Sequence, residues 1–181
     1  MTFGPYSIRL IEKKDAESFF AVIGRNYDRI CTYLPQTADR NQHLQGTLEY
    51  IEERMRLAKE RTFFTYVIVH ESKGQILGAI FLKEFNWVIP KCELGYFVDK
   101  DYEGKGMMSL AMKQIIRHCF EEMKLNKLLI RVADENVPSI RLAEKTGFIR
   151  EGTIRMDFKT MSGQLLDIHY YGLTNENETK T

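Results

Sequence analysis

Long apolar runs are missing from this 181-residue chain. No stretch approaches the roughly 18 consecutive apolar residues that a membrane-spanning helix needs, so we expect no membrane association. The N-terminus, MTFGPYS, lacks the basic segment followed by an apolar one that marks a secretory signal peptide. Together these absences predict a soluble, cytoplasmic protein.

Cysteine is scarce, and its spacing excludes two common uses. The chain has three cysteines, Cys31, Cys92 and Cys119, and no CxxC pair. A structural zinc site is therefore not expected, and we predict no bound metal. An odd number of widely separated cysteines fits a reducing setting better than a disulfide framework.

Neither sign of charge dominates. The chain has 26 Lys and Arg against 25 Asp and Glu, so the overall basic footprint of a nucleic-acid-binding protein is missing and no nucleic-acid partner is expected. Internal repeats and low-complexity linkers are also absent, and 181 residues suit one domain. We predict a single domain over residues 1–173 and a flexible tail over 174–181, which has no apolar residue.

Alternation and helical spacing of apolar residues, with stretches rich in aromatic and β-branched side chains, define the elements of the first half. The expected elements are a strand at 6–12, a helix that Asp15 caps and that continues through Ile23, a helix at 44–60, strands at 62–70 and 76–85 joined as a hairpin, and a strand at 91–98.

From residue 91 onward, strand and helix alternate. The expected elements are a polar loop at 99–106, a helix to about residue 124, a strand at 127–133, a helix that Asn136 caps and Gly147 ends, and strands at 148–158 and 165–173. Strand–helix–strand units form parallel pairs with right-handed crossovers. We therefore expect an α/β (α+β) fold in which helices cover both faces of a mixed sheet.

The segment Glu103-Gly104-Lys105-Gly106-Met107-Met108-Ser109 lies between a predicted strand and a predicted helix. Glycines let the backbone turn tightly and approach a ligand closely, and a helix N-terminus offers unpaired N–H groups to an anion. This arrangement predicts a phosphate or diphosphate site. A plain glycine-rich turn explains the segment equally well.

Two other phosphate-binding motifs do not match. A P-loop requires GxxxxGK[ST], which the segment lacks. The dinucleotide fingerprint requires a third glycine, and Ser109 stands in its place. That fingerprint also belongs to a continuous strand–helix–strand half-domain, whereas a hairpin precedes the segment here.

Three segments together resemble the GNAT superfamily of acetyl-coenzyme A-dependent N-acetyltransferases. The loop resembles its [Q/R]-x-x-G-x-[G/A] motif, with Glu103, Gly106 and Met108 at the first, fourth and sixth positions, and departs from it at the first and sixth. Residues 136–148 resemble its N-x-x-S-x-x-x-x-E-K-x-G-F segment. Residues 92–97, CELGYF, look like the A-E-[IL]-G-Y-W strand of the ribosomal-protein N-acetyltransferase branch.

This resemblance implies a GNAT fold, with a mixed, mostly antiparallel seven-stranded sheet, a parallel central pair and about four helices. It implies acetyl-CoA as cosubstrate and direct transfer of the acetyl group to an amine. A protein N-terminal α-amine, such as that of a ribosomal protein, is the favoured acceptor. A small amine (a polyamine, an amino acid or an antibiotic) and a non-catalytic coenzyme A-binding module are the alternatives. Family members are often homodimers.

The resemblance also implies which residues contact the coenzyme. Its diphosphate would lie on main-chain amides of the loop, and its pantetheine arm would pair with residues 96–98, where the sheet splays. Asn136 would contact the coenzyme, cap its helix, or do both. The expected coenzyme-binding residues are Tyr96, Phe97, Val98, Gly104, Lys105, Gly106, Met107, Met108, Ser109 and Asn136.

Two residues are the predicted catalytic groups. Many family members have a tyrosine that acts as general acid, and Ala143 stands at the matching position here. Ser139, one helical turn earlier, is therefore the predicted donor to the leaving thiolate. A capping role explains Ser139 equally well. Glu93, which alternation places on one strand face with Gly95 and Phe97, is the predicted general base. A structural carboxylate that pairs with a cation is the alternative for Glu93.

Other side chains are weaker candidates. The further possible bases are Asp157, Asp167 and His169. Four aromatic residues could line an acceptor cleft or serve packing alone, namely Tyr33, Phe85, Trp87 and Phe158.

Overall fold

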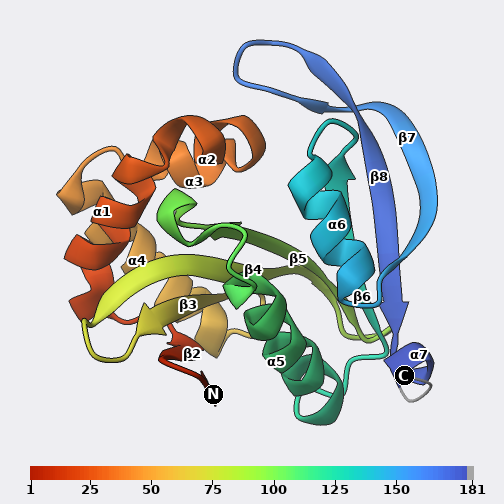
Figure 1. Ribbon diagram of the computed structural model, residues 1–181, viewed down its shortest axis with the longest axis horizontal. Helices are drawn as coiled ribbons and strands as arrows, with labels where there is room; N and C mark the ends of the chain where they lie inside the picture. The colour runs from red at the N-terminus through yellow and green to blue at the C-terminus, as the bar shows by residue number, and fades with distance from the viewer. Residues whose placement is uncertain (179–181) are drawn as a thin grey trace. The chain divides into compact units, whose positions relative to one another are not determined.

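The computed structural model describes residues 1–178 (Figure 1). These residues divide into two compact units. The first unit contains residues 1–81 and 96–107. The second contains residues 82–95 and the described residues from 108 onward. Two strands, β4 (Gln75–Asn86) and β5 (Lys91–Val98), continue through both units. The predicted division into a domain at 1–173 and a tail stays a prediction, and residues 179–181 lie outside the described part.

The first unit combines strands with a group of helices. Its further elements are β1 (Thr2–Phe3), β2 (Tyr6–Leu10), the 3-10 turn η1 (Lys13–Asp15), α1 (Ala16–Arg25), α2 (Tyr27–Tyr33), α3 (Pro35–Arg40), α4 (Leu44–Lys59), β3 (Phe64–His70) and the 3-10 turn η2 (Lys100–Tyr102). The strands β1 and β2 and the strands β2 and β3 are antiparallel pairs. The short helices α2 and α3 are absent from the sequence prediction, because six or seven residues are too few to show helical periodicity.

The apolar face of α1 forms the core of the first unit with α4 and β3, as the spacing predicts. Phe19 and Ile23 of α1 are fully buried, and the Phe19 ring stacks on Tyr50 with 5.9 Å between centroids. Asp15 stands at the N-cap position of α1, as predicted, but its side chain accepts no hydrogen bond from the first turn of the helix. Its carboxylate instead accepts hydrogen bonds from Arg9 at 2.6 and 2.7 Å. The predicted position of the cap is therefore confirmed, and the predicted capping hydrogen bond is wrong.

The second unit alternates strand and helix as expected. Its further elements are α5 (Met107–Glu121), β6 (Lys127–Ala133), α6 (Val137–Lys145), β7 (Ile149–Lys159), β8 (Leu165–Thr174) and the single turn α7 (Asn175–Glu178). The parallel pairing of β5 with β6 runs from Lys91↔Lys127 to Leu94↔Ile130. Antiparallel pairing joins β6 to β8 and β8 to β7, and β7 and β8 form a long hairpin (Figure 1).

Helix α5 buries one apolar face. Met112, Ile115 and Cys119 on this face are fully buried, whereas Lys113 and Arg117 are exposed. This amphipathic pattern is what fixes the helix that begins at the glycine loop. No helix among the described residues is both long enough and apolar enough to cross a membrane.

Hydrogen bonds link the strands in the order β1-β2-β3-β4-β5-β6-β8-β7. The expected mixed, mostly antiparallel sheet with a parallel pair is therefore confirmed, and β5 and β6 are that pair. The sheet has eight strands instead of seven, because two residues at the N-terminus add the short strand β1.

Candidate functional site

The glycine loop adopts a backbone conformation that requires its glycines. Gly104 has φ +71° and Gly106 has φ +76°, in the left-handed region that L side chains rarely adopt. A Cβ built on either residue would meet no atom within 4 Å. The glycines are thus needed for the backbone path itself, and the space beside them is open.

The loop has main-chain donors without an internal acceptor. Within residues 1–178, the amides of Gly104, Lys105 and Gly106 donate to no acceptor. Helix α5 begins directly after them, at Met107, and the first turn of a helix leaves further N–H groups unpaired. The loop therefore fits the anion that the sequence predicts there.

Side chains beside the loop are already engaged. The ammonium of Lys105 donates to the Asp101 carbonyl at 2.6 Å and lies 5.1 Å from the centroid of the Tyr102 ring. The Glu103 carboxylate pairs with the Arg29 guanidinium at 2.7 Å. The side chains of Met107 and Met108 are buried, so only their main chain could reach a ligand, as the sequence analysis expects.

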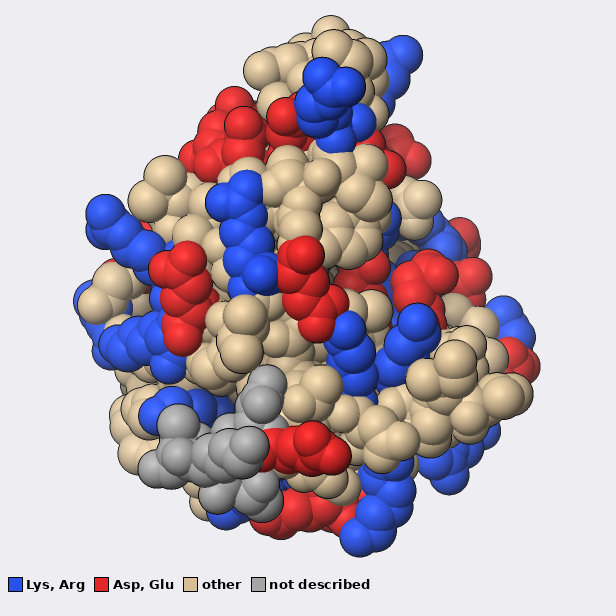
Figure 2. Space-filling model, turned by 90° about the vertical axis from the view of Figure 1, so that its right-hand side faces the viewer, with Lys and Arg blue, Asp and Glu red and all other residues tan. Residues whose placement is uncertain are grey.

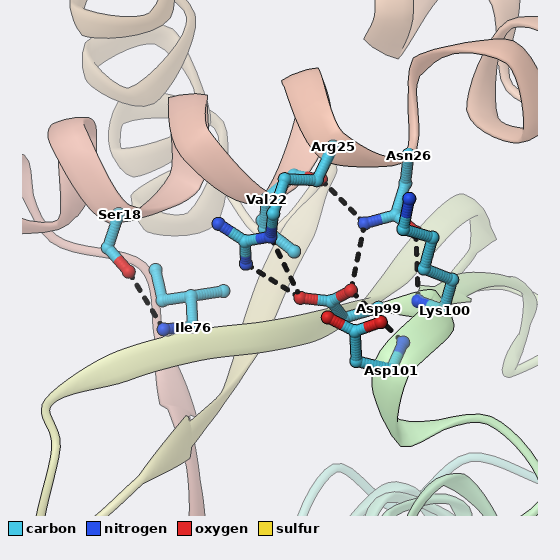
Figure 3. A network of polar contacts seen from close by, with 8 residues as sticks. All are labelled: Ser18, Val22, Arg25, Asn26, Ile76, Asp99, Lys100 and Asp101. Carbon is cyan, nitrogen blue, oxygen red and sulfur yellow. Dashed lines mark hydrogen bonds and ion pairs between the residues drawn. The ribbon is translucent and has the colours of Figure 1, made fainter.

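A buried carboxylate anchors the start of this loop (Figure 3). Asp99 is 1% exposed and accepts from Arg25 Nη2 at 2.6 Å and from Asn26 Nδ2 at 3.3 Å. The Asn26 side chain in turn accepts the Lys100 amide at 2.9 Å, and the Asp101 amide donates to Asp99 at 3.4 Å. The C-terminal end of α1 thus holds the segment that leads into the glycine loop.

Asp99 stays charged in this site. Burial by itself would raise the pKa of Asp99, but the hydrogen bonds from Arg25, Asn26 and the Asp101 amide outweigh burial and lower it. The carboxylate is therefore a structural anion in the first unit.

Residues Tyr96–Val98, which are predicted to contact pantetheine, form the C-terminal end of β5 and belong to the first unit. Phe97 is buried and its ring centroid lies 6.2 Å from those of both Phe19 and Phe81. A Cβ on Gly78 would lie 2.5 Å from the Phe97 carbonyl oxygen, so only glycine lets β4 approach β5 there. The expected splay of the sheet beyond this point, and its contact with pantetheine, stay predictions.

Glu93 lies in the second unit as an ion-paired carboxylate. It is 8% exposed, and its two oxygens lie 2.9 Å from Lys83 Nζ and 2.7 Å from Arg131 Nε. Lys83 comes from β4 and Arg131 from β6, the strands next to β5. The structural role that the sequence analysis left open for Glu93 is thus present in the geometry.

The Arg131 side chain extends this network to the β7–β8 hairpin. Arg131 also hydrogen-bonds the Tyr170 hydroxyl, which donates to Asp157 Oδ2 at 2.7 Å. The Asp157 hydrogen bond is the main reason that the pKa of Tyr170 is raised. Since its proton is held by Asp157, Tyr170 is a poor donor to any other group. Asp157, a weaker candidate in the sequence analysis, is thereby linked to Glu93 through Arg131.

The N-terminus of α6 carries the two polar residues that the second family segment predicts. Asn136 caps the helix, with its side-chain oxygen accepting the Ser139 amide at 3.3 Å. Ser139 is half-buried in the first turn, and Ala143 is fully buried one turn later. The capping role of Asn136 is confirmed. Its contact with coenzyme and the donor role of Ser139 stay predictions.

The other candidate bases have partners of their own. Asp167 accepts the Met156 amide at 2.9 Å, at the irregular part of β7. The Nδ1 atom of His169 lies 3.0 Å from the Thr153 hydroxyl. These contacts fit a role for both residues in holding the β7–β8 hairpin.

The predicted aromatic cleft is only partly brought together. The Phe85 and Trp87 rings stack with 4.9 Å between centroids in the second unit. A cleft that combines these rings with Tyr33 or Phe158 stays a prediction.

On the face of the molecule shown in Figure 2, charged side chains of both signs are interspersed. Figure 2 shows Lys and Arg among Asp and Glu on the viewed face, without a large field of one sign. Among residues 1–178, no three His, Cys, Asp or Glu side chains are grouped to hold a metal ion.

Sequence reasoning missed the partners of the buried carboxylates Asp99 and Glu93. Arg25 and Asp99 lie 74 positions apart, and no local pattern links them. A signal for Arg131 did exist, because alternation places it on the strand face away from Ile130 and Val132. Combined with parallel pairing of 91–98 and 127–133, that alternation brings Arg131 near Glu93.

Comparison with known proteins agrees with this geometry. Residues 7–149 match the model of the acetyltransferase (GNAT) domain. The Bacillus subtilis protein YdaF, provisionally named a ribosomal N-acetyltransferase, is 31% identical over 172 residues, which is 92% of this chain and 90% of YdaF. A spermidine N(1)-acetyltransferase from Vibrio cholerae is 25% identical over 56% of this chain and 58% of its own.

Solved structures show the same fold. A ribosomal-protein-S5-alanine acetyltransferase from Vibrio fischeri has a TM-score of 0.90 at 22% identity and covers 97% of this chain and 96% of its own. A ribosomal L7/L12 α-N-protein acetyltransferase in complex with coenzyme A has a TM-score of 0.87 at 16% identity, with 95% of each chain covered. The family match over most of the chain and the glycine loop together identify the cosubstrate as acetyl-CoA. The chain belongs to the GNAT family and is an acetyltransferase.

Proposed function

We propose that this enzyme acetylates the N-terminal α-amine of a protein, such as a ribosomal protein, with acetyl-CoA as donor. The observation that carries the proposal is the 31% identity to a protein provisionally named a ribosomal N-acetyltransferase, over almost the full length of both chains. The CELGYF strand, which includes the ion-paired Glu93, supports the same branch of the family.

The glycine loop is the proposed site for the diphosphate of the coenzyme. The unpaired amides of Gly104, Lys105 and Gly106 supply donors, and the N-terminus of α5 adds a favourable dipole. The coenzyme brings the acetyl thioester, and the chain's own residues bind it and move the protons.

Glu93 is the proposed base for the acceptor amine. An incoming ammonium is the same chemical group as the Lys83 side chain that Glu93 binds at 2.9 Å. The acceptor can therefore take the place of Lys83, whose side chain is 26% exposed and free to swing into water. Transfer of one proton to Glu93 would then leave a neutral amine, the form that attacks a thioester.

Ser139 is the proposed donor to the leaving thiolate. It is half-buried in the first turn of α6, and the buried Ala143 supplies no hydroxyl. A hydrogen bond from a serine stabilises developing negative charge on sulfur without needing a shifted pKa.

A second candidate is acetylation of a polyamine. The match to a spermidine acetyltransferase favours it, although that match covers little more than half of each chain. The charges around Glu93 favour an acceptor with one positive charge, because Arg131 stays beside the carboxylate when Lys83 moves away and would repel the further charges of a polycation.

An acceptor panel tests the proposal. The full chain is incubated with acetyl-CoA and peptides with free Ser, Ala or Met N-termini, and thiol release is followed. The matched controls are the same peptides with blocked N-termini and an internal lysine, together with spermidine and free amino acids. We expect release only with free N-termini. Release with spermidine alone would favour the second candidate, and coenzyme binding without any release would indicate a binding module.

A further inference from the structure

The side chains of the glycine loop do not favour an anion. Residues 99–106, DKDYEGKG, contain two lysines and three acidic residues, so their formal charges sum to −1. The one basic side chain between the glycines, Lys105, is directed to the Asp101 carbonyl and the Tyr102 ring. The loop thus offers a coenzyme phosphate main-chain donors but no net positive charge, which a cation from another element would supply.

Arg29 of α2 is such a cation. Its Nη2 lies 2.7 Å from Glu103 Oε1, so the guanidinium stands beside the residue that precedes Gly104. Both side chains are about half exposed, at 46% and 43%, and a ligand at the loop can reach them. A guanidinium has five N–H donors, and one contact to Glu103 leaves others for a phosphate.

We propose that Arg29 is a coenzyme-binding residue that contacts a phosphate group of acetyl-CoA, and that Glu103 holds it at the loop. This inference rests on the proposed coenzyme site at Gly104–Gly106. It also accounts for the acidic residue at the first motif position: the Glu103 carboxylate positions a cation instead of facing the anion. A phosphate carries more negative charge than a carboxylate and competes well for the same guanidinium.

The competing explanation is an ordinary surface ion pair. Such pairs contribute little to stability, and Arg29 would then only neutralise Glu103. The two explanations predict different coenzyme affinities for the double variant, which lacks both the Arg29 cation and the Glu103 carboxylate. An ordinary ion pair predicts that removing Arg29 has no effect once Glu103 is uncharged. A phosphate contact predicts that the affinity is still lost.

The experiment measures coenzyme A affinity by titration calorimetry for the wild type, Arg29→Ala, Glu103→Gln and the double variant. We expect Arg29→Ala to weaken binding about 10-fold, the typical effect of losing one hydrogen bond to a charged group. Glu103→Gln should bind about as tightly as the wild type, because its amide oxygen still accepts a hydrogen bond from Arg29 and its negative charge is gone. The double variant should remain about 10-fold weaker than Glu103→Gln. If it binds as tightly as Glu103→Gln, the proposal is wrong.

A matched control separates this effect from a general loss of surface charge. Arg56 pairs with Glu60 at 2.6 Å within α4 and is similarly exposed, at 58% and 47%. Arg56→Ala should leave coenzyme affinity unchanged, and thermal unfolding should show that every variant is folded. An equal loss of affinity in Arg56→Ala would overturn the proposal.

Truncated ligands identify the phosphate. If Arg29→Ala loses affinity for coenzyme A and for 3′-dephospho-coenzyme A alike, Arg29 contacts the diphosphate. If the loss disappears with the dephospho form, the contact is to the 3′-phosphate. An unchanged affinity for both ligands contradicts the inference alone, whereas a wild type that binds neither ligand contradicts the coenzyme site itself.

Discussion

Two buried carboxylates, Asp99 in the first unit and Glu93 in the second, have environments of different kinds. Asp99 is held by Arg25 at the end of α1, by the side-chain amide of Asn26, which follows α1, and by a main-chain N–H of its own loop. Glu93 is held by Lys83 and Arg131, the two being 26% and 41% exposed. Both carboxylates pair with partly exposed cations, Arg25 at 35% for Asp99. Asp99 is also held by the buried Asn26 amide and by its own loop, whereas Glu93 is held by cations alone.

The difference separates a structural anion from one suited to chemistry. The partners of Asp99 are fixed by a helix end, so replacing them would unfold the start of the glycine loop. The partners of Glu93 can be exchanged for a substrate ammonium without moving a strand. We therefore expect changes at Asp99 to affect stability and coenzyme binding, and changes at Glu93 to affect turnover.

The largest expected effect is on turnover, from Glu93→Gln. Loss of a general base lowers kcat by about 100-fold or more, while coenzyme affinity should stay within about 2-fold, because the amide keeps the shape of the side chain. Steady-state kinetics and calorimetry measure the two quantities.

Lys83→Met is the companion variant. It should lower the KM for the acceptor, because it removes the Lys83 ammonium that competes with the acceptor for Glu93. A kcat within a few-fold of the wild type in Glu93→Gln would assign Glu93 to structure, like Asp99.

The next effect is on stability, from Asp99→Asn. Breaking a buried ion pair costs about 3 kcal/mol, and the partial exposure of Arg25 puts this pair toward the lower end of the usual range. We expect a lower free energy of unfolding in urea and weaker coenzyme binding, with kcat at saturation little changed. A stable variant with normal affinity would show that Asp99 does not anchor the loop.

The pH dependence of stability sharpens the same test. The folded pKa of Asp99 lies below its unfolded value of about 4, so its stabilisation is complete above that value. It is lost as the pH falls through the folded pKa, when the carboxylate takes a proton and releases Arg25. Urea unfolding between about pH 6 and pH 2 should thus show a steeper acid decline for the wild type than for Asp99→Asn. If the free energy of unfolding falls equally steeply with pH in both proteins, Asp99 does not supply this stabilisation.

A smaller effect is expected from Gly106→Ala, with Gly74→Ala as its matched control. Both glycines have positive φ, +76° and +63°, and a Cβ on either would meet no atom within 4 Å. Each substitution should cost about 1 kcal/mol of stability, since only the backbone is strained. Only Gly106→Ala should also weaken coenzyme A binding, because its Cβ would occupy the space of the ligand. Equal coenzyme affinity in the two variants would remove the anion site from this loop.

An effect confined to the chemical step is expected from Ser139→Ala. We expect kcat to fall by about 10-fold, the contribution of one hydrogen bond to developing charge. Asn136 continues to cap α6, so the unfolding temperature should hold. Ser139→Thr keeps the hydroxyl and should retain most of the activity. If alanine and threonine behave alike, Ser139 belongs to the helix cap only.

The sequence by itself determined the features that depend on neighbours in the chain. Strand alternation, the buried stripe of α5, the Asn136 cap and the glycine loop all follow from residues within a few positions of one another, because backbone conformation and amphipathic faces are local properties. The tertiary structure decided what each carboxylate does. Asp99 meets Arg25 and Asn26 across more than 70 positions, and Glu93 meets cations from two other strands. Charge pairing acts over a few ångströms of space whatever the separation along the chain, so only the folded arrangement reveals it.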